Sequence, residues 1–219
     1  MKSYKVFETK RKLKQYGMAI VFIVILVFGW QYPLLGYFIP LCMLLGVGMG
    51  MFWGRKWCDW YCPRGSFYDA LIQPVSAKKN IPPLFKKMYF RIGVFALLML
   101  IMTVNLILRW PLASKIGLFF VSMLTTTTLL GIMLAFFFHQ RSWCTICPIG
   151  TLIHLTGCAR NQLKINSALC VECKLCAKVC PVQIKPYLYK GKGIASVKDK
   201  DCVKCGSCVA VCLKKASYF

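Results

Sequence analysis

The sequence predicts an integral membrane protein that is mostly α-helical and carries a small soluble α+β domain in its C-terminal part. Hydrophobic residues make up 58% of the 219 residues, and they are concentrated before residue 140. The net charge is nevertheless +23, and the chain contains 14 cysteines. Long apolar segments favour membrane helices, whereas the charged, cysteine-rich remainder favours a soluble module.

The first apolar region runs from residue 15 to residue 54 without a charged side chain. Its length is about twice the roughly 20 residues that one crossing of a bilayer requires. We therefore expect a helical hairpin that turns at Gln31-Tyr32-Pro33. A second pair of spans is expected at 88–108 and 116–139, joined by a short segment. Four spans with tight turns leave both chain ends on the same side of the membrane.

The basic residues indicate the orientation of these spans. Six Lys and Arg precede the first span, eight lie from Arg55 to Arg91, in the loop before the third span and in its first turn, and thirteen follow the fourth; only Arg109 and Lys115 lie in the other loops. Positive charge gathers on the cytoplasmic side, so we predict a multi-pass protein of a prokaryotic inner cell membrane with cytoplasmic N- and C-termini. The charge is thus explained by topology and contact with membrane lipid. We expect no nucleic-acid partner, because no motif resembles a nucleic-acid recognition module.

Each predicted hairpin ends in a similar cysteine motif, at residues 58–65 and 144–150. Both motifs follow the frame Arg-x-Trp-Cys, two or three residues, then Cys-Pro-x-Gly. The predicted membrane fold is therefore four transmembrane helices arranged as two parallel two-helix repeats, with both motifs at the cytoplasmic interface. The motif cysteines are Cys58, Cys62, Cys144 and Cys147.

Eight further cysteines form two runs of the same spacing, Cys-x2-Cys-x2-Cys-x3-Cys, with a proline after the first run. This spacing is the signature of a bacterial-type ferredoxin domain with two 4Fe–4S clusters, in which the fourth cysteine of each run ligates the other cluster. A zinc site uses four ligands from two short knuckles and does not account for this pattern. The assignment is Cys170, Cys173, Cys176 and Cys212 for one cluster, and Cys202, Cys205, Cys208 and Cys180 for the other.

Three interpretations of the four membrane-motif cysteines remain open. They bind a third iron–sulfur cluster at the repeat interface, since the spacing turns two thiolates of each motif toward one metal centre. Alternatively, they are redox-active dithiols, because neighbouring cysteines beside basic residues have a lowered pKa. The third interpretation is a structural role at helix ends. The duplication of the motif favours a symmetric shared site.

These motifs divide the chain into three parts: a basic cytoplasmic N-terminus (1–15), the membrane domain (16–160) and the ferredoxin domain (161–219). Two cysteines lie outside the motifs. Cys42 shares one face of the second span with Gly46, Gly50 and Gly54, and such small-residue faces pack helices closely. Cys158 is expected to be a small buried residue.

Motifs of the Cys-x3-Cys-Pro type after paired spans, followed by a two-cluster ferredoxin, resemble the NapH-type membrane polyferredoxins; NosR and CcoG share these elements. The resemblance implies an electron-transfer subunit of an oxidoreductase, a quinol dehydrogenase, that exchanges electrons between the quinone pool and the other subunits of a redox complex. The second motif departs from the pattern, because only two residues separate Cys144 from Cys147.

The CcoG resemblance supports an alternative function, the reduction of copper or another metal during metalloenzyme assembly. The ten methionines are spread through the predicted helices, which favours the quinone interpretation.

Quinol oxidation releases protons, yet the predicted spans contain no Asp or Glu. If a quinone binds at the cytoplasmic interface, Asp59 and His139 are the candidate proton partners. For Asp59, the alternative is a salt bridge to Arg55, Arg64 or a neighbouring lysine. The two histidines, His139 and His154, do not form the mid-membrane pair that a transmembrane haem requires.

Overall fold

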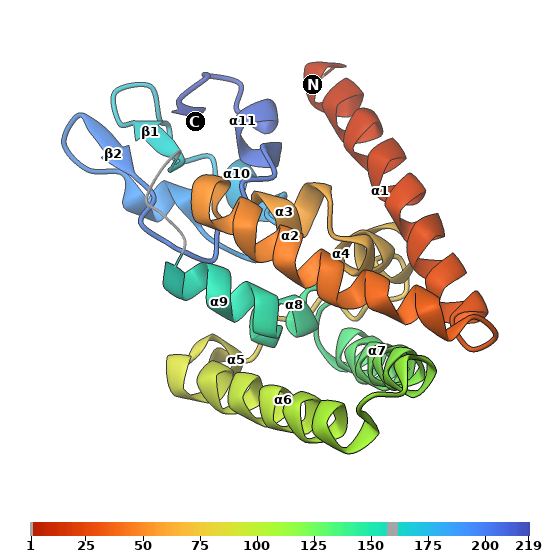
Figure 1. Ribbon diagram of the computed structural model, residues 1–219. Coiled ribbons are helices and arrows are strands. Elements are labelled where there is room, and N and C mark those ends of the chain that lie inside the picture. Colours follow the sequence, from red (N-terminus) through yellow and green to blue (C-terminus); the bar gives the residue numbers. More distant parts are fainter. Residues whose placement is uncertain (1, 157–161) are drawn as a thin grey trace.

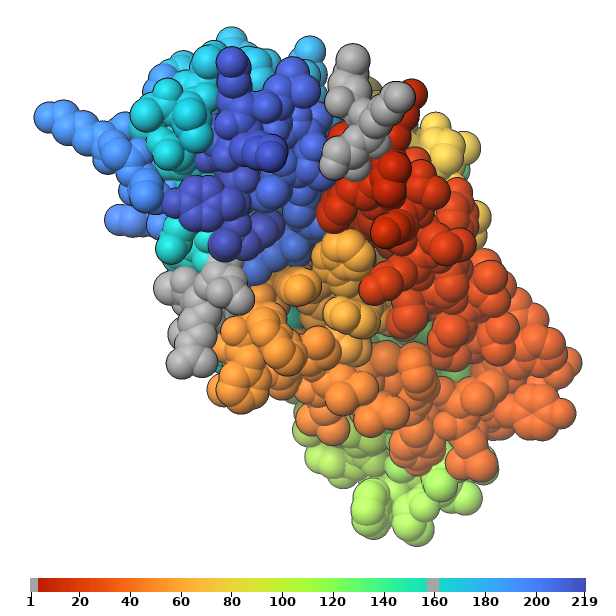
Figure 2. Space-filling model, turned by 90° about the horizontal axis from the view of Figure 1, so that it is seen from above, coloured from red at the N-terminus to blue at the C-terminus, as the bar shows by residue number. Residues whose placement is uncertain are grey.

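The computed structural model describes residues 2–156 and 162–219, so Cys158 and the predicted boundary between residues 160 and 161 lie outside the described residues. A body of helices carries a small α+β module at one end (Figure 1). Both chain termini lie at this end. Figure 2 shows the module, in blue, beside the red N-terminal half of the first helix, α1 (Lys2–Phe28).

Three helical segments of the described residues are long and apolar enough to cross a membrane: Pro33–Trp53, Met88–Arg109 and Ala113–Phe137. They correspond to the second, third and fourth predicted spans. The first segment is a short 3-10 helix, η1 (Pro33–Tyr37), that continues into α2 (Phe38–Trp53). The other two are α6 and α7. Large apolar side chains such as Leu44, Leu100 and Leu129 are exposed on these helices, as expected for surfaces that face lipid.

The first predicted span forms the C-terminal half of α1. Because α1 is continuous from Lys2 to Phe28, the predicted boundary between residues 15 and 16 falls inside a helix. Three basic residues, Arg11, Lys12 and Lys14, immediately precede its apolar half, and α1 is not among the three candidate spans. The arrangement of four spans in two repeats therefore stays a prediction.

Glycines allow the helices to approach closely at two places. Gly36 of η1 lies against the backbone of Gly117 in α7, where a Cβ atom on either residue would collide with the other segment. Gly46 and Gly50 of α2 face Trp57 and Ile153, so this side of α2 is the packing face that the small residues predicted.

Each cysteine motif folds into two short helices separated by a Cys-Pro step. After α2 come α3 and α4, and after α7 come α8 and α9; proline begins the second helix of each pair because its missing N–H is not needed there. The bounds are α3 (Lys56–Trp60), α4 (Pro63–Phe67), the π-helical turn η2 (Tyr68–Ile72), α5 (Pro83–Lys86), α8 (Ser142–Ile146) and α9 (Pro148–Thr156).

The C-terminal module contains a three-stranded antiparallel sheet of order β2-β1-β3. Ile165 of β1 is paired with Ala195 on one side and Ser217 on the other. The core of the module also includes Cys58 and Ile153 of the membrane domain, so the two domains share one hydrophobic core. The elements are β1 (Lys164–Asn166), α10 (Leu175–Lys178), η3 (Pro186–Tyr189), β2 (Ile194–Ser196), α11 (Ser207–Val211) and β3 (Ser217–Tyr218).

Candidate metal centres

The structure gathers the eight cysteines of the C-terminal module into two sets of four. The fourth cysteine of each run, Cys180 or Cys212, lies with the first three cysteines of the other run. One cavity is lined by Cys170, Cys173, Cys176 and Cys212, and another by Cys202, Cys205, Cys208 and Cys180. These are the two crossed sets that the spacing predicted.

The backbone follows the same internal repeat as the cysteines, with an offset of 32 positions (Cys170 to Cys202). Positive φ angles recur at matching positions, at Glu172 and Lys204 and again at Gln183 and Lys215. Such residues reverse the chain locally and turn N–H groups toward the cysteines. Lys174 and Gly206 form a third matched pair with positive φ angles.

Backbone amides donate hydrogen bonds to two of these sulfur atoms. The N–H of Ile184 donates to Cys180 Sγ at 3.3 Å, and the N–H of Ala216 donates to Cys212 Sγ at 3.2 Å. Among the described residues, no group of three or more His, Cys, Asp or Glu lies close enough to hold one metal ion. In a 4Fe–4S cluster each thiolate binds a different iron, so the sulfur atoms lie farther apart than the ligands of a single metal ion. Cysteines spread around a cavity, with N–H groups directed at their sulfur atoms, therefore fit a cluster.

The four membrane-motif cysteines also line a single cavity. Cys58 comes from α3 and Cys144 from α8, whereas Cys62 and Cys147 precede α4 and α9. Trp57 and Trp143 line the same cavity. In the first motif the N–H of Gly65 donates to Cys62 Sγ at 3.4 Å, as expected where a Cys-Pro step exposes backbone donors.

Two arginines cross between the motifs in a reciprocal way. Arg55, from the first motif, donates through Nη2 to the carbonyl oxygen of Cys144 at 2.7 Å. Arg141, from the second motif, donates through Nη1 to the carbonyl oxygen of Cys58 at 2.9 Å and lies 3.8 Å from Cys144 Sγ. The arginine of the shared Arg-x-Trp-Cys frame thus supports the opposite motif. The repeated frame contained this signal, but the spacing of its residues predicted no contact between either arginine and the opposite motif.

Burial raises the pKa of the thiols of Cys58, Cys62 and Cys144 above the ordinary thiol value; Arg55 opposes this shift at Cys58 and Arg141 opposes it at Cys144. This direction is opposite to the lowered pKa expected for redox-active dithiols. As free thiols they are protonated at neutral pH, and a bound metal is a means of holding them as thiolates.

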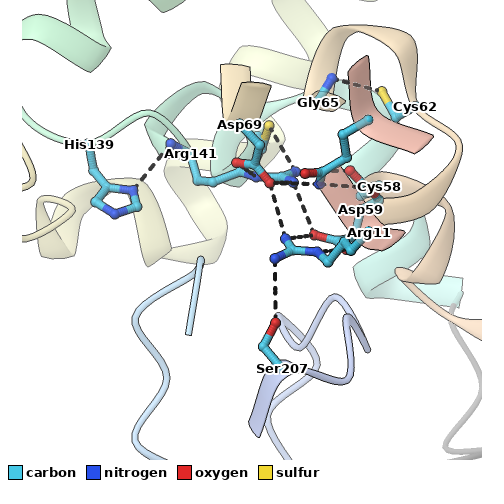
Figure 3. Close-up of polar contacts among 11 residues, drawn as sticks. Arg11, Cys58, Asp59, Cys62, Gly65, Asp69, His139, Arg141 and Ser207 are labelled. Atoms are coloured by element: carbon cyan, nitrogen blue, oxygen red, sulfur yellow. Dashed lines mark hydrogen bonds and ion pairs between the residues drawn. The ribbon is translucent and has the colours of Figure 1, made fainter. Parts of the chain in front are cut away.

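A buried ionic network lies beside this cavity and is shown in Figure 3. Asp59 accepts hydrogen bonds from Arg11 at 2.6 and 2.8 Å and from Arg141 at 3.1 Å. Asp69 also accepts from both arginines, and Gln15 donates to it at 3.0 Å. Burial acts to raise the pKa of Asp69, but Arg141 and Arg11 lower it by more. The net shift is downward, so the carboxylate stays ionised.

The alternative expected for Asp59, a salt bridge, is observed, but the expected partners are wrong. The observed partners are Arg11 of α1 and Arg141, which directly precedes α8, and not Arg55, Arg64 or a neighbouring lysine.

This ionic network and a second one, centred on Asp201, connect the membrane domain to the C-terminal module. Arg11 lies 3.4 Å from the hydroxyl of Ser207, the residue before Cys208. Asp201, the residue before Cys202, accepts from Arg55 at 2.7 Å, from Arg91 at 2.8 Å and contacts His154 at 3.0 Å. The role of Asp201 could not be read from the sequence, since its partners lie far away along the chain.

His139 lies beside the first network without being paired to an acid. Its ring is buried, and Nδ1 accepts from the N–H of Arg141 at 3.2 Å. Burial lowers the pKa of His139 to about 4, with Arg141 and Lys86 acting in the same direction and Asp69 in the opposite one. His139 is therefore neutral at pH 7, and its role as a proton partner stays a prediction.

A separate apolar cavity of about 120 Å³ lies between the membrane helices. Cys62 and Cys147 line its end toward the membrane-motif cavity, and Cys42 lines it from α2. Three methionines, Met43, Met99 and Met123, also line it, although they are far apart in the sequence.

Comparison with known proteins identifies iron–sulfur domains in both parts of the chain. A family model described as a 4Fe-4S binding domain matches residues 35–82 and 116–165, and one described as a 4Fe-4S dicluster domain matches 162–213. No solved structure matches the chain.

Three relatives are similar over much of their length. The ferredoxin-type protein NapH of Haemophilus influenzae is 30% identical over 179 residues, which cover 75% of this chain and 62% of that protein. An uncharacterised protein of Methanocaldococcus jannaschii is 26% identical, over 80% of this chain and 68% of its own length. The methylamine utilization ferredoxin-type protein MauN of Methylobacillus flagellatus is 26% identical, over 60% of this chain and 50% of that protein.

Proposed function

Because the chain belongs to the NapH-type polyferredoxins, we propose that it is a membrane-bound iron–sulfur subunit that passes electrons between the quinone pool and protein partners of a redox complex. One observation carries the proposal. Cys58 of the membrane motifs lies in the same hydrophobic core as Cys205 and Cys208, and cysteines of both module sets pack against that core. The three sets of four cysteines are thus contiguous.

The two crossed sets of the module are proposed to hold one 4Fe–4S cluster each. Such clusters, when bound, supply reversible one-electron carriers. The cysteines would supply the thiolate ligands, and the N–H groups of Ile184 and Ala216 would stabilise the sulfur charge of Cys180 and Cys212.

We assign the third site to the cavity lined by Cys58, Cys62, Cys144 and Cys147. Its support is the convergence of four buried sulfurs from both motifs, with Gly65 N–H directed at one of them. Arg55 and Arg141 would offset the negative charge of four thiolates there. A metal-bound third site is therefore favoured over free dithiols.

The packing also suggests the order of the centres. The set that contains Cys205 and Cys208 is buried next to Cys58, whereas the other set includes the exposed Cys173. We propose that the set with Cys205 and Cys208 exchanges electrons with the membrane motifs. The set with Cys173 would then face a protein partner, and the lysines beside it, Lys174 and Lys214, favour an acidic partner surface.

For the quinone we propose the apolar cavity between the membrane helices. It is lined almost entirely by apolar side chains and ends at Cys62 and Cys147 of the third site, so a quinone ring there would lie next to that centre. Its position differs from the cytoplasmic interface expected from the sequence. Of the two expected proton partners, Asp59 has both oxygens bound by arginines, which favours His139. His139 does not line the apolar cavity, so proton transfer to it would need an intervening relay.

We propose that the chain crosses the membrane four times, with its N- and C-termini in the cytoplasm. Ile20, Val24 and Val27 in the C-terminal half of α1 are exposed apolar residues, as a lipid-facing helix requires. The two chain ends lie at the same end of the molecule (Figure 1), which agrees with an even number of crossings. Attachment of a thiol-reactive, membrane-impermeant label to single cysteines introduced at Thr9 and Trp110 would test this topology.

The first experiment measures iron and acid-labile sulfide per chain in anaerobically purified protein. We expect about twelve irons, falling to about eight when Cys58, Cys62, Cys144 and Cys147 are all changed to serine. Cys42→Ser serves as the control and should retain about twelve. About eight irons in all three proteins would show that the membrane-motif cysteines hold no cluster.

The second experiment adds a menaquinone analogue to dithionite-reduced protein and follows reoxidation. Leu124→Trp, which fills the apolar cavity, should slow reoxidation at least about tenfold, since the ring would occupy the quinone position. Leu129→Trp places the same ring on the exposed face of α7 and should have little effect. Reoxidation at the same rate in all three proteins would exclude this cavity as the quinone site.

A second candidate function, metal reduction during metalloenzyme assembly, gains support from one observation. The methionines are not simply dispersed, because Met43, Met99 and Met123 line the same cavity as Cys42. Thioether and thiolate sulfurs are ligands that Cu(I) prefers. If this function holds, changing the three methionines to leucine should abolish stoichiometric Cu(I) binding, whereas Met133→Leu on the exposed face should not.

A further inference from the structure

A large polar cavity of about 660 Å³ lies where α1, the segment 78–86 and the C-terminal module meet. It is separate from the cysteine cavities and from the apolar cavity of the membrane helices, although Cys180 borders it. Gln183 of the module is hydrogen-bonded to the segment 78–86, which forms another wall of the cavity. Its carboxamide donates to the carbonyl oxygen of Lys79 at 2.9 Å and accepts from the N–H of Ile81 at 2.9 Å. The cavity therefore has walls from both domains.

Its rim is strongly basic. Lysines come from α1, from the segment 78–86 and from the module, and Glu8 lies among them, whereas the acidic residue Asp69 lies in the floor. In the described chain, none of these lysines forms an ion pair with an acidic side chain. The five are Lys12, Lys78, Lys86, Lys178 and Lys185.

The floor contains a buried polar group without a partner. The Gln140 side chain is only 4% exposed, and its Oε1 has no hydrogen-bond partner among residues 2–156 and 162–219. Leaving such a group unpaired is energetically costly, so it marks a place where a partner fits. Rotation of the carboxamide by half a turn presents its two N–H donors to the cavity instead. The other buried polar floor residues, Arg11, Gln15 and Asp69, already bind one another.

We propose that this cavity binds the phosphate group of an anionic ligand. Unpaired lysines around a buried carboxamide are the groups that receive phosphate oxygens. An anionic lipid headgroup is one source of that chemistry, because α5 directly precedes the candidate span α6 and basic pockets at this level attract such headgroups. A soluble phosphate compound is the other.

A phosphate there would reduce repulsion between lysines of the two domains. Lys12 and Lys78 belong to the membrane part, whereas Lys178 and Lys185 belong to the module. An anion between them would hold the module against the membrane domain at the edge that carries Cys180. Ligand binding would therefore stabilise the docked arrangement without contacting the membrane-motif cysteines.

The test uses the full, iron-loaded protein in neutral detergent, with phosphatidylglycerol, phosphatidylcholine or inorganic pyrophosphate added. Native mass spectrometry measures the bound ligand and its apparent affinity. We expect retention of phosphatidylglycerol, pyrophosphate or both, and none of phosphatidylcholine. Phosphatidylglycerol alone identifies a lipid headgroup, whereas pyrophosphate alone identifies a soluble phosphate compound. The absence of binding by either anion would overturn the proposal.

Variants then separate a built site from general attraction to a basic protein. The triple variant Lys12→Gln, Lys78→Gln and Lys86→Gln should weaken binding about tenfold or more. Lys192→Gln, Lys198→Gln and Lys200→Gln remove the same charge from lysines outside the cavity and should change affinity less than twofold. Equal losses in the two triple variants would overturn the proposal.

Gln140→Leu provides a test that leaves the charge unchanged. Binding should weaken several-fold while the iron content stays at the wild-type value. Unchanged affinity in this variant would remove the carboxamide from the site and contradict the proposal.

Discussion

Arg141 and Cys58 lie 83 positions apart, and the guanidinium group of Arg141 donates to the carbonyl oxygen of Cys58 at 2.9 Å. The reciprocal contact joins Arg55 to the carbonyl oxygen of Cys144 at 2.7 Å. The reciprocal geometry extends to the glycine of each Cys-Pro-x-Gly step. Gly65 faces Arg141, and Gly150 faces Arg55, so each motif leaves room for the arginine of the other.

These glycines provide the first prediction. A Cβ on Gly65 would lie 2.6 Å from the Cys58 oxygen, and one on Gly150 would lie 2.9 Å from both the Cys144 oxygen and Arg55 Nη2. We expect Gly65→Ala and Gly150→Ala each to destabilise the protein by about 1–3 kcal/mol, because backbone or arginine must move. Thermal unfolding in detergent measures the change.

The matched controls are Gly48→Ala and Gly93→Ala, since a Cβ at either position meets nothing within 4 Å. Alanine should be neutral or slightly stabilising there. Equal unfolding temperatures in all four variants would show that the glycines are not needed for this close approach.

The second prediction concerns Asp201. Asp201→Asn removes the carboxylate shared by Arg55 and Arg91, both of which are buried. Leaving buried cations without their partner should cost about 3–5 kcal/mol of unfolding free energy. Glu172→Gln removes an acid of the same module that is half exposed and forms a surface ion pair with Lys190, so it should cost less than about 1 kcal/mol. Denaturant unfolding distinguishes the two, and similar losses would contradict the assigned importance of Asp201.

The third prediction is a pH effect at His139. Burial lowers its pKa from 6.5 to about 4, so between these values the unfolded chain binds a proton that the folded chain does not. Stability contributed by the neutral ring is therefore lost as the pH falls from about 6.5, by at most about 3 kcal/mol. The unfolding temperature of His139→Asn should fall less than that of the wild type between pH 7 and pH 5. Parallel pH profiles would show that His139 does not titrate in this way.

The fourth prediction tests the crossed cysteine sets. Cys176 and Cys212 line one cavity, whereas Cys180 lines the other. Changing Cys176 and Cys212 together to serine should remove one cluster, about four irons, since both losses fall on the same set. Changing Cys176 and Cys180 together should damage both sets and remove about eight. The reverse result would show that each run binds its own cluster.

Much of the fold follows from patterns that are local in the sequence. The predicted spans 88–108 and 116–139 agree closely with α6 and α7, because a long, predominantly apolar segment is stable in a bilayer only as a helix. The grouping of Cys180 and Cys212 with the opposite runs was also predicted, since a repeat with a constant offset folds into two equivalent halves.

Other features depend on which segments pack together. Asp59 was expected to pair with Arg55 or Arg64, which are near it in sequence, but its partners are Arg11 and Arg141. Sequence spacing identifies neighbours within one helix and gives no information on partners from other helices. The same limit applies to Asp201 and to the methionines of the apolar cavity.

The cysteine spacing and the apolar segments therefore specify an iron–sulfur protein with membrane helices. The tertiary structure alone decides that the membrane motifs lie against the cluster set of Cys205 and Cys208, and that Arg11, Arg55 and Arg141 hold this junction together. The physical reason is that ligand spacing and hydropathy act through neighbours along the chain, whereas a buried charge takes its partner from whichever segments the packing of the apolar helices brings to it.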